Sequence, residues 1–309
     1  MGLFDRIRKS DTPQSISARW QAEAASYLQY NRYNDALYCY DQAVSADPES
    51  APAWHGKGQL LAKFGKKEES LACYDHAISL RPDSAVYYHN KGDALSAFGD
   101  MDAAVPCFQK ALSYEPDNVI FLTSYARILA HFGRFREADG VMVHVCELEP
   151  RAPEHWFYRA TMLFDAEKLD DAFACYRAVL EIAPGHAPSY FNCGNICREQ
   201  EKYAEAVSYY DRALKYDRTM TGAMNNKGLA LSCLGKHREA FDCFRRVLIA
   251  LPDAPDIWYN KGYELLQLGY PDDAVAAFDT ALQNCTDTQT ELAERCRAAK
   301  ADALAGKNS

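Results

Sequence analysis

The chain has 309 residues, of which 48% are apolar and 25% are charged, so it can bury a large core and is expected to fold rather than remain disordered. Its 43 acidic residues outnumber its 34 Lys and Arg residues, giving a formal net charge of −9. Nucleic acid is therefore not an expected partner, because phosphate binding needs a basic face. No apolar run approaches the roughly 18 residues of a membrane span, and the start, MGLFDRIRKSDTPQ, lacks the apolar core of a secretory signal. We expect a cytoplasmic protein that does not enter the membrane.

A ten-residue sequence recurs along the chain. It reads GKGQLLAKFG at residues 56–65, NKGDALSAFG at 90–99, NKGLALSCLG at 226–235 and NKGYELLQLG at 260–269. From Asn90 to Asn226 is 136 residues, four times 34, and from Asn226 to Asn260 is 34. A fixed period of this length indicates stacked structural repeats.

The same period divides most of the chain. Cutting every 34 residues from Ser17 gives eight contiguous repeats, numbered 1 to 8: 17–50, 51–84, 85–118, 119–152, 153–186, 187–220, 221–254 and 255–288. Residues within a repeat are numbered below as positions 1 to 34. All four tryptophans occupy position 4 of their repeats: Trp20, Trp54, Trp156 and Trp258. Chance does not produce this agreement, so the period reflects real structural units.

Each repeat is predicted to form two amphipathic helices. Apolar or small residues at positions 4, 8 and 11, and again at 20, 24 and 27, have the i, i+4, i+7 spacing of one helix face. Position 8 is Gly or Ala throughout, and position 20 is Ala except for Ser70, so the two helices can approach closely. Position 24 is large in every repeat: Tyr40, Tyr74, Phe108, Met142, Tyr176, Tyr210, Phe244 and Phe278. Proline at position 32 ends the second helix in six repeats, with Arg218 and Thr286 replacing it in the other two.

This set of positions resembles the tetratricopeptide repeat family, whose pattern W-x2-L-G-x2-Y, A-x3-F, P matches positions 4, 8, 11, 20, 24 and 32. The resemblance covers residues 17–288 and implies an all-α solenoid, a right-handed superhelix of eight helix pairs. Glu23 and Lys57 depart from the pattern at position 7, where the family prefers Leu. The Asn-Lys-Gly sequence at positions 6–8 is similar to that of archaeal and bacterial members of the family.

The two ends of the chain lie outside these repeats. Residues 289–309 place Leu292, Cys296 and Ala299 at positions 4, 8 and 11 of an incomplete ninth repeat, so we expect one helix that caps the apolar end of the stack. Residues 1–16 form a leader, in which residues 2–9 are long enough only for a short lid.

Eleven cysteines raise the question of metal or disulfide chemistry, but five of them share position 23 and are interpreted as packing residues. Equivalent residues of adjacent repeats should lie about 8–10 Å apart, beyond the roughly 7 Å limit for a bridged Cα pair. Cys193 and Cys197 have no nearby His or Cys to complete a zinc site. Catalytic and nucleotide-binding signatures are also missing, so we expect a non-catalytic protein without metal or cofactor.

Function is expected at positions that vary between repeats. In the family, the inner face is lined mainly by positions 2, 5, 6, 9, 12 and 13. Repeats 5–8 carry aromatic residues beside amides at these positions, a mixture typical of binding surfaces. The candidate peptide-binding groove consists of Arg127, Phe157, Tyr158, Phe191, Asn192, Asn195, Arg198, Asn225, Asn226, Tyr259, Asn260 and Tyr263. We therefore predict a protein-interaction scaffold whose concave groove binds an extended segment of a partner protein.

Asn192, Asn226 and Asn260 occupy position 6 of three successive repeats. A side-chain amide both donates and accepts, so it can pair with a peptide backbone without reading its side chains. The resemblance extends to the repeat domain of the O-linked N-acetylglucosamine transferase, which uses a similar asparagine ladder. Two alternatives stay open: these residues serve solubility and local packing, or the protein is an assembly module that self-associates as a homo-oligomer or couples a larger complex through its edges.

Overall fold

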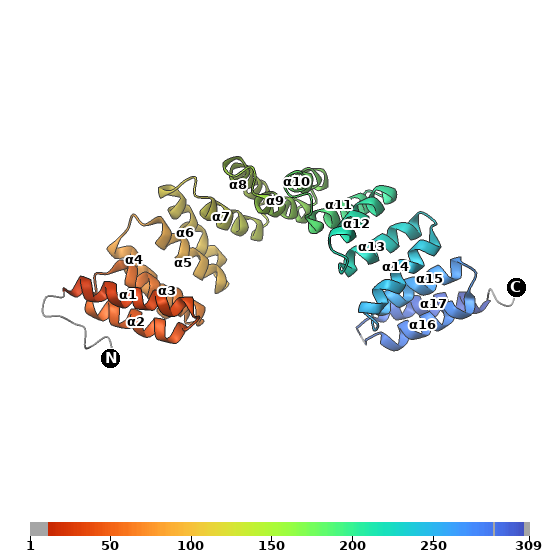
Figure 1. Cartoon of the computed structure of the whole chain (residues 1–309), viewed down its shortest axis with the longest axis horizontal. Coiled ribbons are helices and arrows are strands. Elements are labelled where there is room, and N and C mark those ends of the chain that lie inside the picture. The colour runs from red at the N-terminus through yellow and green to blue at the C-terminus, as the bar shows by residue number, and fades with distance from the viewer. Residues whose placement is uncertain (1–11, 287, 306–309) are drawn as a thin grey trace. The chain divides into compact units, whose positions relative to one another are not determined.

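The computed structural model describes residues 12–286 and 288–305, and within this part the chain forms seventeen α-helices and no β-strand (Figure 1). The prediction of an all-α fold is confirmed. The proposed lid at residues 2–9 lies outside the described residues. The helices are α1 (Pro13–Gln29), α2 (Tyr33–Ala46), α3 (Ala51–Lys63), α4 (Lys67–Leu80), α5 (Ala85–Ala97), α6 (Met101–Tyr114), α7 (Val119–His131), α8 (Phe135–Leu148), α9 (Pro153–Asp165), α10 (Leu169–Ile182), α11 (Ala187–Glu199), α12 (Tyr203–Tyr216), α13 (Thr221–Cys233), α14 (His237–Ala250), α15 (Pro255–Gln267), α16 (Pro271–Asn284) and α17 (Thr290–Ala305).

The chain divides into two compact units, residues 1–150 and 151–309. In each unit, every helix packs against the next one in the chain. Odd-numbered helices also contact one another: α3 with α5 and α5 with α7 in the N-terminal unit, and α11 with α13, α13 with α15 and α15 with α17 in the C-terminal unit. The odd-numbered helices therefore lie side by side as one layer within each unit.

The turn inside each repeat explains why the recurring decapeptide ends in glycine. Position 15 has a positive φ in all eight repeats, for example 73° at Gly65, because the chain must reverse there between two helices. The Gly65 and Lys66 amides donate to the carbonyls of Ala62 and Leu61 and satisfy two carbonyls at the end of α3. Three repeats place a residue other than glycine in this conformation: Asn31, Glu167 and Glu201.

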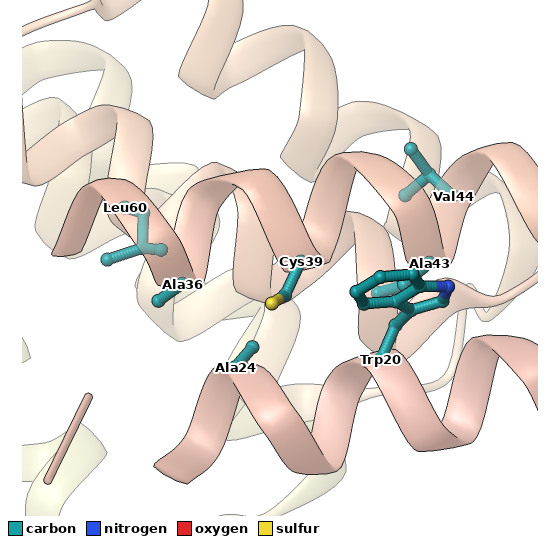
Figure 2. Packing of buried hydrophobic residues seen from close by; sticks show 8 residues of the cluster. Trp20, Ala24, Ala36, Cys39, Ala43, Val44 and Leu60 are labelled. Atoms are coloured by element: carbon teal, nitrogen blue, oxygen red, sulfur yellow. The ribbon is translucent and has the colours of Figure 1, made fainter. Parts of the chain in front are cut away.

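The core repeats one contact, in which the large residue at position 24 lies on the small residue at position 8. A Cβ atom added to Gly194 would lie 2.6 Å from the Tyr210 ring, and one added to Gly262 would lie 2.7 Å from the Phe278 ring. Both rings are fully buried, so position 8 must be small for the helices to reach this separation. Figure 2 shows another part of the core, in repeat 1, where Trp20 and Ala24 of α1 face Cys39 and Ala43 of α2.

All eleven cysteines are free thiols, and most are buried. Burial raises the pKa of Cys193 to about 12 and that of Cys39 to about 11, so these thiols stay protonated and unreactive. Across residues 12–286 and 288–305, no group of three or more His, Cys, Asp or Glu side chains is arranged to hold a metal ion. None of the described helices combines the length and the apolar character that crossing a membrane requires.

Helix α17 follows the last repeat, where the sequence predicts a single helix. Its Cys296 and Ala303 are buried, and it packs against α16 and α15. Lys300 of α17 pairs with Asp279 of α16 at 2.5 Å. The buried side of α17 thus covers the apolar end of the C-terminal unit.

Candidate functional site

Eleven of the twelve candidate groove residues belong to the C-terminal unit and lie on its odd-numbered helices. They are Phe157 and Tyr158 on α9, Phe191, Asn192, Asn195 and Arg198 on α11, Asn225 and Asn226 on α13, and Tyr259, Asn260 and Tyr263 on α15. The twelfth, Arg127, lies on α7 in the N-terminal unit. Its guanidinium pairs with the Asp93 carboxylate at 3.2 Å, an exposed contact between position 9 of two successive repeats.

A buried tyrosine hydroxyl joins neighbouring repeats at the centre of these residues. The Tyr210 hydroxyl donates to Asn195 Oδ1 at 2.9 Å, and Asn226 Nδ2 donates to the same oxygen at 2.9 Å. Burial raises the pKa of Tyr210 to about 12, so its hydroxyl remains a donor at neutral pH. Position 24 of one repeat thereby fixes position 9 of the same repeat and position 6 of the next.

The preceding repeat makes the same connection. Thr161 lies 3.3 Å from the Tyr176 hydroxyl, and the Asn192 side chain also hydrogen-bonds to that hydroxyl. Asn192 and Asn226 therefore hold neighbouring repeats together, in addition to any contact with a ligand. This link was not predicted from the sequence. In repeats 5 and 6, Tyr at position 24 goes with a polar residue at position 9 and Asn at the next position 6, but repeat 2 has the same combination and its Asn90 bonds to His55 instead.

Asn260 differs from the other two asparagines of the series. The repeat before it has Phe244 at position 24 and Leu229 at position 9, so neither a hydroxyl nor an amide is available there. Among the described residues, the Asn260 side chain has no hydrogen-bond partner, and it is half-buried on α15. Its amide keeps its full capacity to donate and accept.

Two further polar atoms of the candidate site lack partners. Over residues 12–286 and 288–305, the buried side-chain nitrogen and oxygen atoms without a hydrogen bond are Arg198 Nε on α11 and Asn225 Oδ1 on α13. Asn225 Nδ2 donates to Asn226 Oδ1 at 3.3 Å, which orients the Asn225 amide. A buried polar atom without a partner is unfavourable by about 1–3 kcal/mol, so both are unusual features of α11 and α13.

The aromatic residues at position 5 lean against the buried rings of position 24. Ring centroids are 5.7 Å apart for Phe157 and Tyr176, and 6.1 Å apart for Phe191 and Tyr210. The position-5 rings are half-buried, so each offers one apolar side to the surface. At the C-terminal end, the Arg295 guanidinium of α17 lies 4.6 Å from the Tyr259 ring centroid and covers part of that ring.

The N-terminal unit contains a different network of hydrogen-bonded side chains at positions 5 and 6 of its repeats. Asn90 Nδ2 donates to His55 Nε2 at 2.7 Å, Asn90 Oδ1 lies 3.2 Å from His89 Nδ1, and His89 Nε2 lies 3.0 Å from Ser124 Oγ. Burial lowers the pKa of His55 to about 4, so this ring is neutral and can accept from Asn90. A cavity of about 350 Å³ lies beside these hydrogen-bonded side chains, between α3 and α5, with Gln59, Lys63 and Asp93 in its wall. This cavity was not predicted from the sequence.

The lysine of the recurring NKG sequence has a structural role. At position 7, Lys57, Lys91 and Lys227 pair with the aspartate at position 25 of the preceding repeat, at 2.8, 2.5 and 2.6 Å. For Lys261, the residue at position 25 of the preceding repeat is Arg245, and the Lys261 ammonium lies 4.3 Å from the Trp258 ring centroid. Burial lowers the pKa of Lys261; the Asp273 carboxylate opposes this shift, and the nearby Arg245 charge adds to it.

The repeated helix pairs define the class of this protein as an all-α solenoid repeat protein. Models of the tetratricopeptide repeat match residues 22–85, 85–118, 153–219 and 225–287. The chain belongs to the tetratricopeptide repeat family.

Curated relatives match shorter stretches. Residues of this chain are 34% identical over 73 residues to protein O-mannosyl-transferase TMTC1 of Homo sapiens, covering 22% of this chain and 8% of TMTC1. They are 28% identical over 156 residues to protein FlbA of Caulobacter vibrioides, covering 50% of this chain and 26% of FlbA. The chain thus spans a small part of the length of either relative.

Solved structures share the fold at low identity. The C-terminal part of a TPR repeat-containing protein from Cytophaga hutchinsonii has a TM-score of 0.65 at 14% identity, covering 74% of this chain and 94% of that chain. YrrB, a TPR protein with an unusual peptide-binding site, has a TM-score of 0.52 at 24% identity, covering 61% of this chain and 97% of that chain. PilW, a type IV pilus biogenesis factor, has a TM-score of 0.58 at 19% identity, covering 67% and 96%. These likenesses concern the fold alone.

Proposed function

We propose that the C-terminal unit binds an extended segment of a partner protein along α9, α11, α13 and α15. The tetratricopeptide repeat fold supports a protein-interaction scaffold, and members of this family typically are non-catalytic. The observation that carries the proposal is the pair of unsatisfied polar atoms, Arg198 Nε and Asn225 Oδ1, within the predicted groove. Both atoms are buried in the free protein, so side-chain rotation must expose them. A peptide backbone can then supply a C=O for Arg198 Nε and an N–H for Asn225 Oδ1.

Asn260 adds a third polar group to this surface. Its amide is not used by the scaffold among the described residues, whereas Asn192 and Asn226 are already bonded to neighbouring repeats. The half-buried rings of Phe157, Phe191 and Tyr259 offer apolar contact for side chains of the segment. Arg198 is the groove cation in this unit and favours an acidic residue. The ligand that fits is an extended segment with alternating apolar and polar side chains.

The test asks whether the groove residues bind a peptide or only hold the repeats together. The full-length chain is immobilised and used to select binders from a display library of unstructured 12-residue peptides, and the affinity of enriched peptides is measured by calorimetry. Replacing Asn225 and Asn260 by Ala removes two hydrogen bonds of about 0.5–1.5 kcal/mol each, so we expect binding to weaken about tenfold. The control is Asn34→Ala on α2, an exposed asparagine outside the groove.

Circular dichroism must show that both variants keep their helices. Equal affinity of the selected peptides for the wild type and the double variant contradicts the groove proposal, as does a library that yields no binder. In that case light scattering should be used to look for a dimer or larger assembly, because association through the edges then becomes the better account.

A further inference from the structure

A cavity of about 260 Å³ lies at the junction of repeats 6 and 7, where the turn before α13 meets the end of α14. Met220, Met224, Val247 and Ala250 form its apolar wall, and Arg218 and Arg246 stand beside them. Small-molecule pockets measure about 300–1,000 Å³, so this cavity suits one large side chain rather than a cofactor. It is called the Met224 pocket below.

Comparison with the other repeats explains why the pocket exists. In repeat 3, Tyr88 at position 4 stacks on Tyr114 at position 30, with ring centroids 6.1 Å apart. In repeat 6, Tyr190 and Tyr216 stack in the same way at 5.8 Å, with an interplanar angle of 8°. Repeat 7 has Met224 and Ala250 at these positions, the smallest such pair in the chain. The pocket occupies the place that a tyrosine ring fills elsewhere in the same protein.

The surface around the pocket is apolar where other repeats are polar. Ile249 at position 29 is 78% exposed, although the other seven repeats have Ser, Glu, Lys or Gln there. Leu251, two residues later, is 47% exposed. Ile249 itself lines the pocket, so its exposed apolar surface is continuous with the apolar wall.

The charge beside the pocket is positive on a protein whose net charge is −9. Arg218 stands where six repeats have proline, and Arg246 lies on α14. Neither arginine forms an ion pair within the described part of the chain, and both are exposed. The neighbouring Asp217 carboxylate accepts from the Thr219 amide at 2.9 Å and from the Thr219 hydroxyl at 2.7 Å, so it is held by its own turn.

We propose that the Met224 pocket binds a tyrosine side chain of a partner protein, within a segment that has acidic residues on both sides of that tyrosine. The ring would stack on Met224 and Ala250 as Tyr114 stacks on Tyr88, because the two sites are equivalent in the repeat. The flanking carboxylates would pair with Arg218 and Arg246. None of the pocket's residues is among the twelve groove residues, although Met224 lies on α13 next to Asn225.

The probe is a capped, fluorescein-labelled peptide, GSEEYEEGS, with the tyrosine-to-alanine peptide GSEEAEEGS as its control. Binding to the full chain is followed by anisotropy and by NMR of methionine methyl groups. Ring currents from the tyrosine should shift the methyl signals of Met220 and Met224, while those of the buried Met142 and Met162 stay unchanged. We expect the alanine peptide to bind at least about tenfold more weakly, as for loss of an aromatic anchor.

Two kinds of variant assign the site. Ala250→Tyr places a ring of the protein itself in the pocket and should abolish binding. Ala250→Leu should also block the pocket, with the residue that repeats 2 and 4 have at this position. Arg218→Glu with Arg246→Glu should weaken binding about tenfold, whereas Arg238→Glu, an exposed change on the same α14, should not.

The proposal is overturned if the Met220 and Met224 methyl signals do not move at saturating peptide, or if a folded position-250 variant binds as the wild type does. Equal binding of the tyrosine and alanine peptides would reduce the site to a charged patch and overturn it as well.

Discussion

His55 should make the N-terminal unit lose stability as the pH falls from about 6.5 to about 4. The ring is largely buried on α3, stacks on Tyr87 with centroids 4.7 Å apart, and accepts a hydrogen bond from Asn90. Burial lowers its pKa from the usual 6.5 to about 4. Between these two values the unfolded chain binds a proton that the folded chain does not, so protonation favours unfolding.

The magnitude follows from the shift. The free energy of unfolding should fall by about 1.4 kcal/mol for each pH unit in this window, and by about 3 kcal/mol in all. Above pH 6.5 both states are neutral and the contribution is constant. Protonation also removes the His55 lone pair to which Asn90 donates, and the loss of this hydrogen bond likewise favours unfolding.

The assay compares urea unfolding of the wild type and His55→Phe at half-unit steps from pH 4 to pH 7. Phenylalanine occurs at this position in repeats 5 and 6, so the substitution suits the fold and removes the titration. Other groups, including His186, whose pKa burial also lowers, are present in both proteins and cancel in the difference. Parallel curves for the two proteins, or an NMR titration of His55 near pH 6.5, would refute this reasoning.

Two further predictions concern the packing of repeats. Arg245→Asp should give Lys261 the partner that Lys57, Lys91 and Lys227 have, and raise stability by about 0.5–1 kcal/mol in urea unfolding at low salt. Arg245→Asn removes the repulsion and, like Arg245→Asp, the exposed Arg245–Asp242 pair at 3.5 Å. An aspartate variant no more stable than the asparagine variant would therefore show that no pair with Lys261 forms. Gly194→Ala should destabilise by about 1–3 kcal/mol because its Cβ would lie 2.6 Å from the buried Tyr210 ring. Gly140 also lies within a helix, but a Cβ atom added there would meet no atom within 4 Å, so Gly140→Ala should stabilise the protein by about 0.5–1 kcal/mol. Thermal melts that rank the two glycine variants in the opposite order would contradict this account of the core.

Helices and core could be predicted from the sequence because both depend on residue size and spacing. Glycine at position 8 and a large ring at position 24 are readable without coordinates, and the structure places Gly194 directly against Tyr210. The turn residues were less accessible, since Glu167 and Glu201 adopt the positive φ that glycine has in other repeats. A period identifies the position, but the conformation of that position comes from the helices on each side.

The candidate site shows where sequence reasoning stopped. A helical period places Asn192, Asn226 and Asn260 on one face, but it does not say which neighbouring group each amide meets. That outcome depends on a residue in the preceding repeat, a tyrosine hydroxyl for the first two and Phe244 for the third. The Met224 pocket was equally hidden, because its walls come from residues 218–224 and 246–250, which are far apart in the sequence.

The lysine–aspartate contacts between repeats also bear on how an array of this kind can lengthen by gene duplication. A tandem copy of residues 51–84 would bring Asp75 opposite the new copy of Lys57 and form an attractive junction at once. A tandem copy of residues 221–254 would instead bring Arg245 opposite a second Lys227, two positive charges at a half-buried boundary. By this charge rule repeat 2 can be duplicated in tandem more readily than repeat 7, and the order of the repeats is constrained by charge as well as by shape.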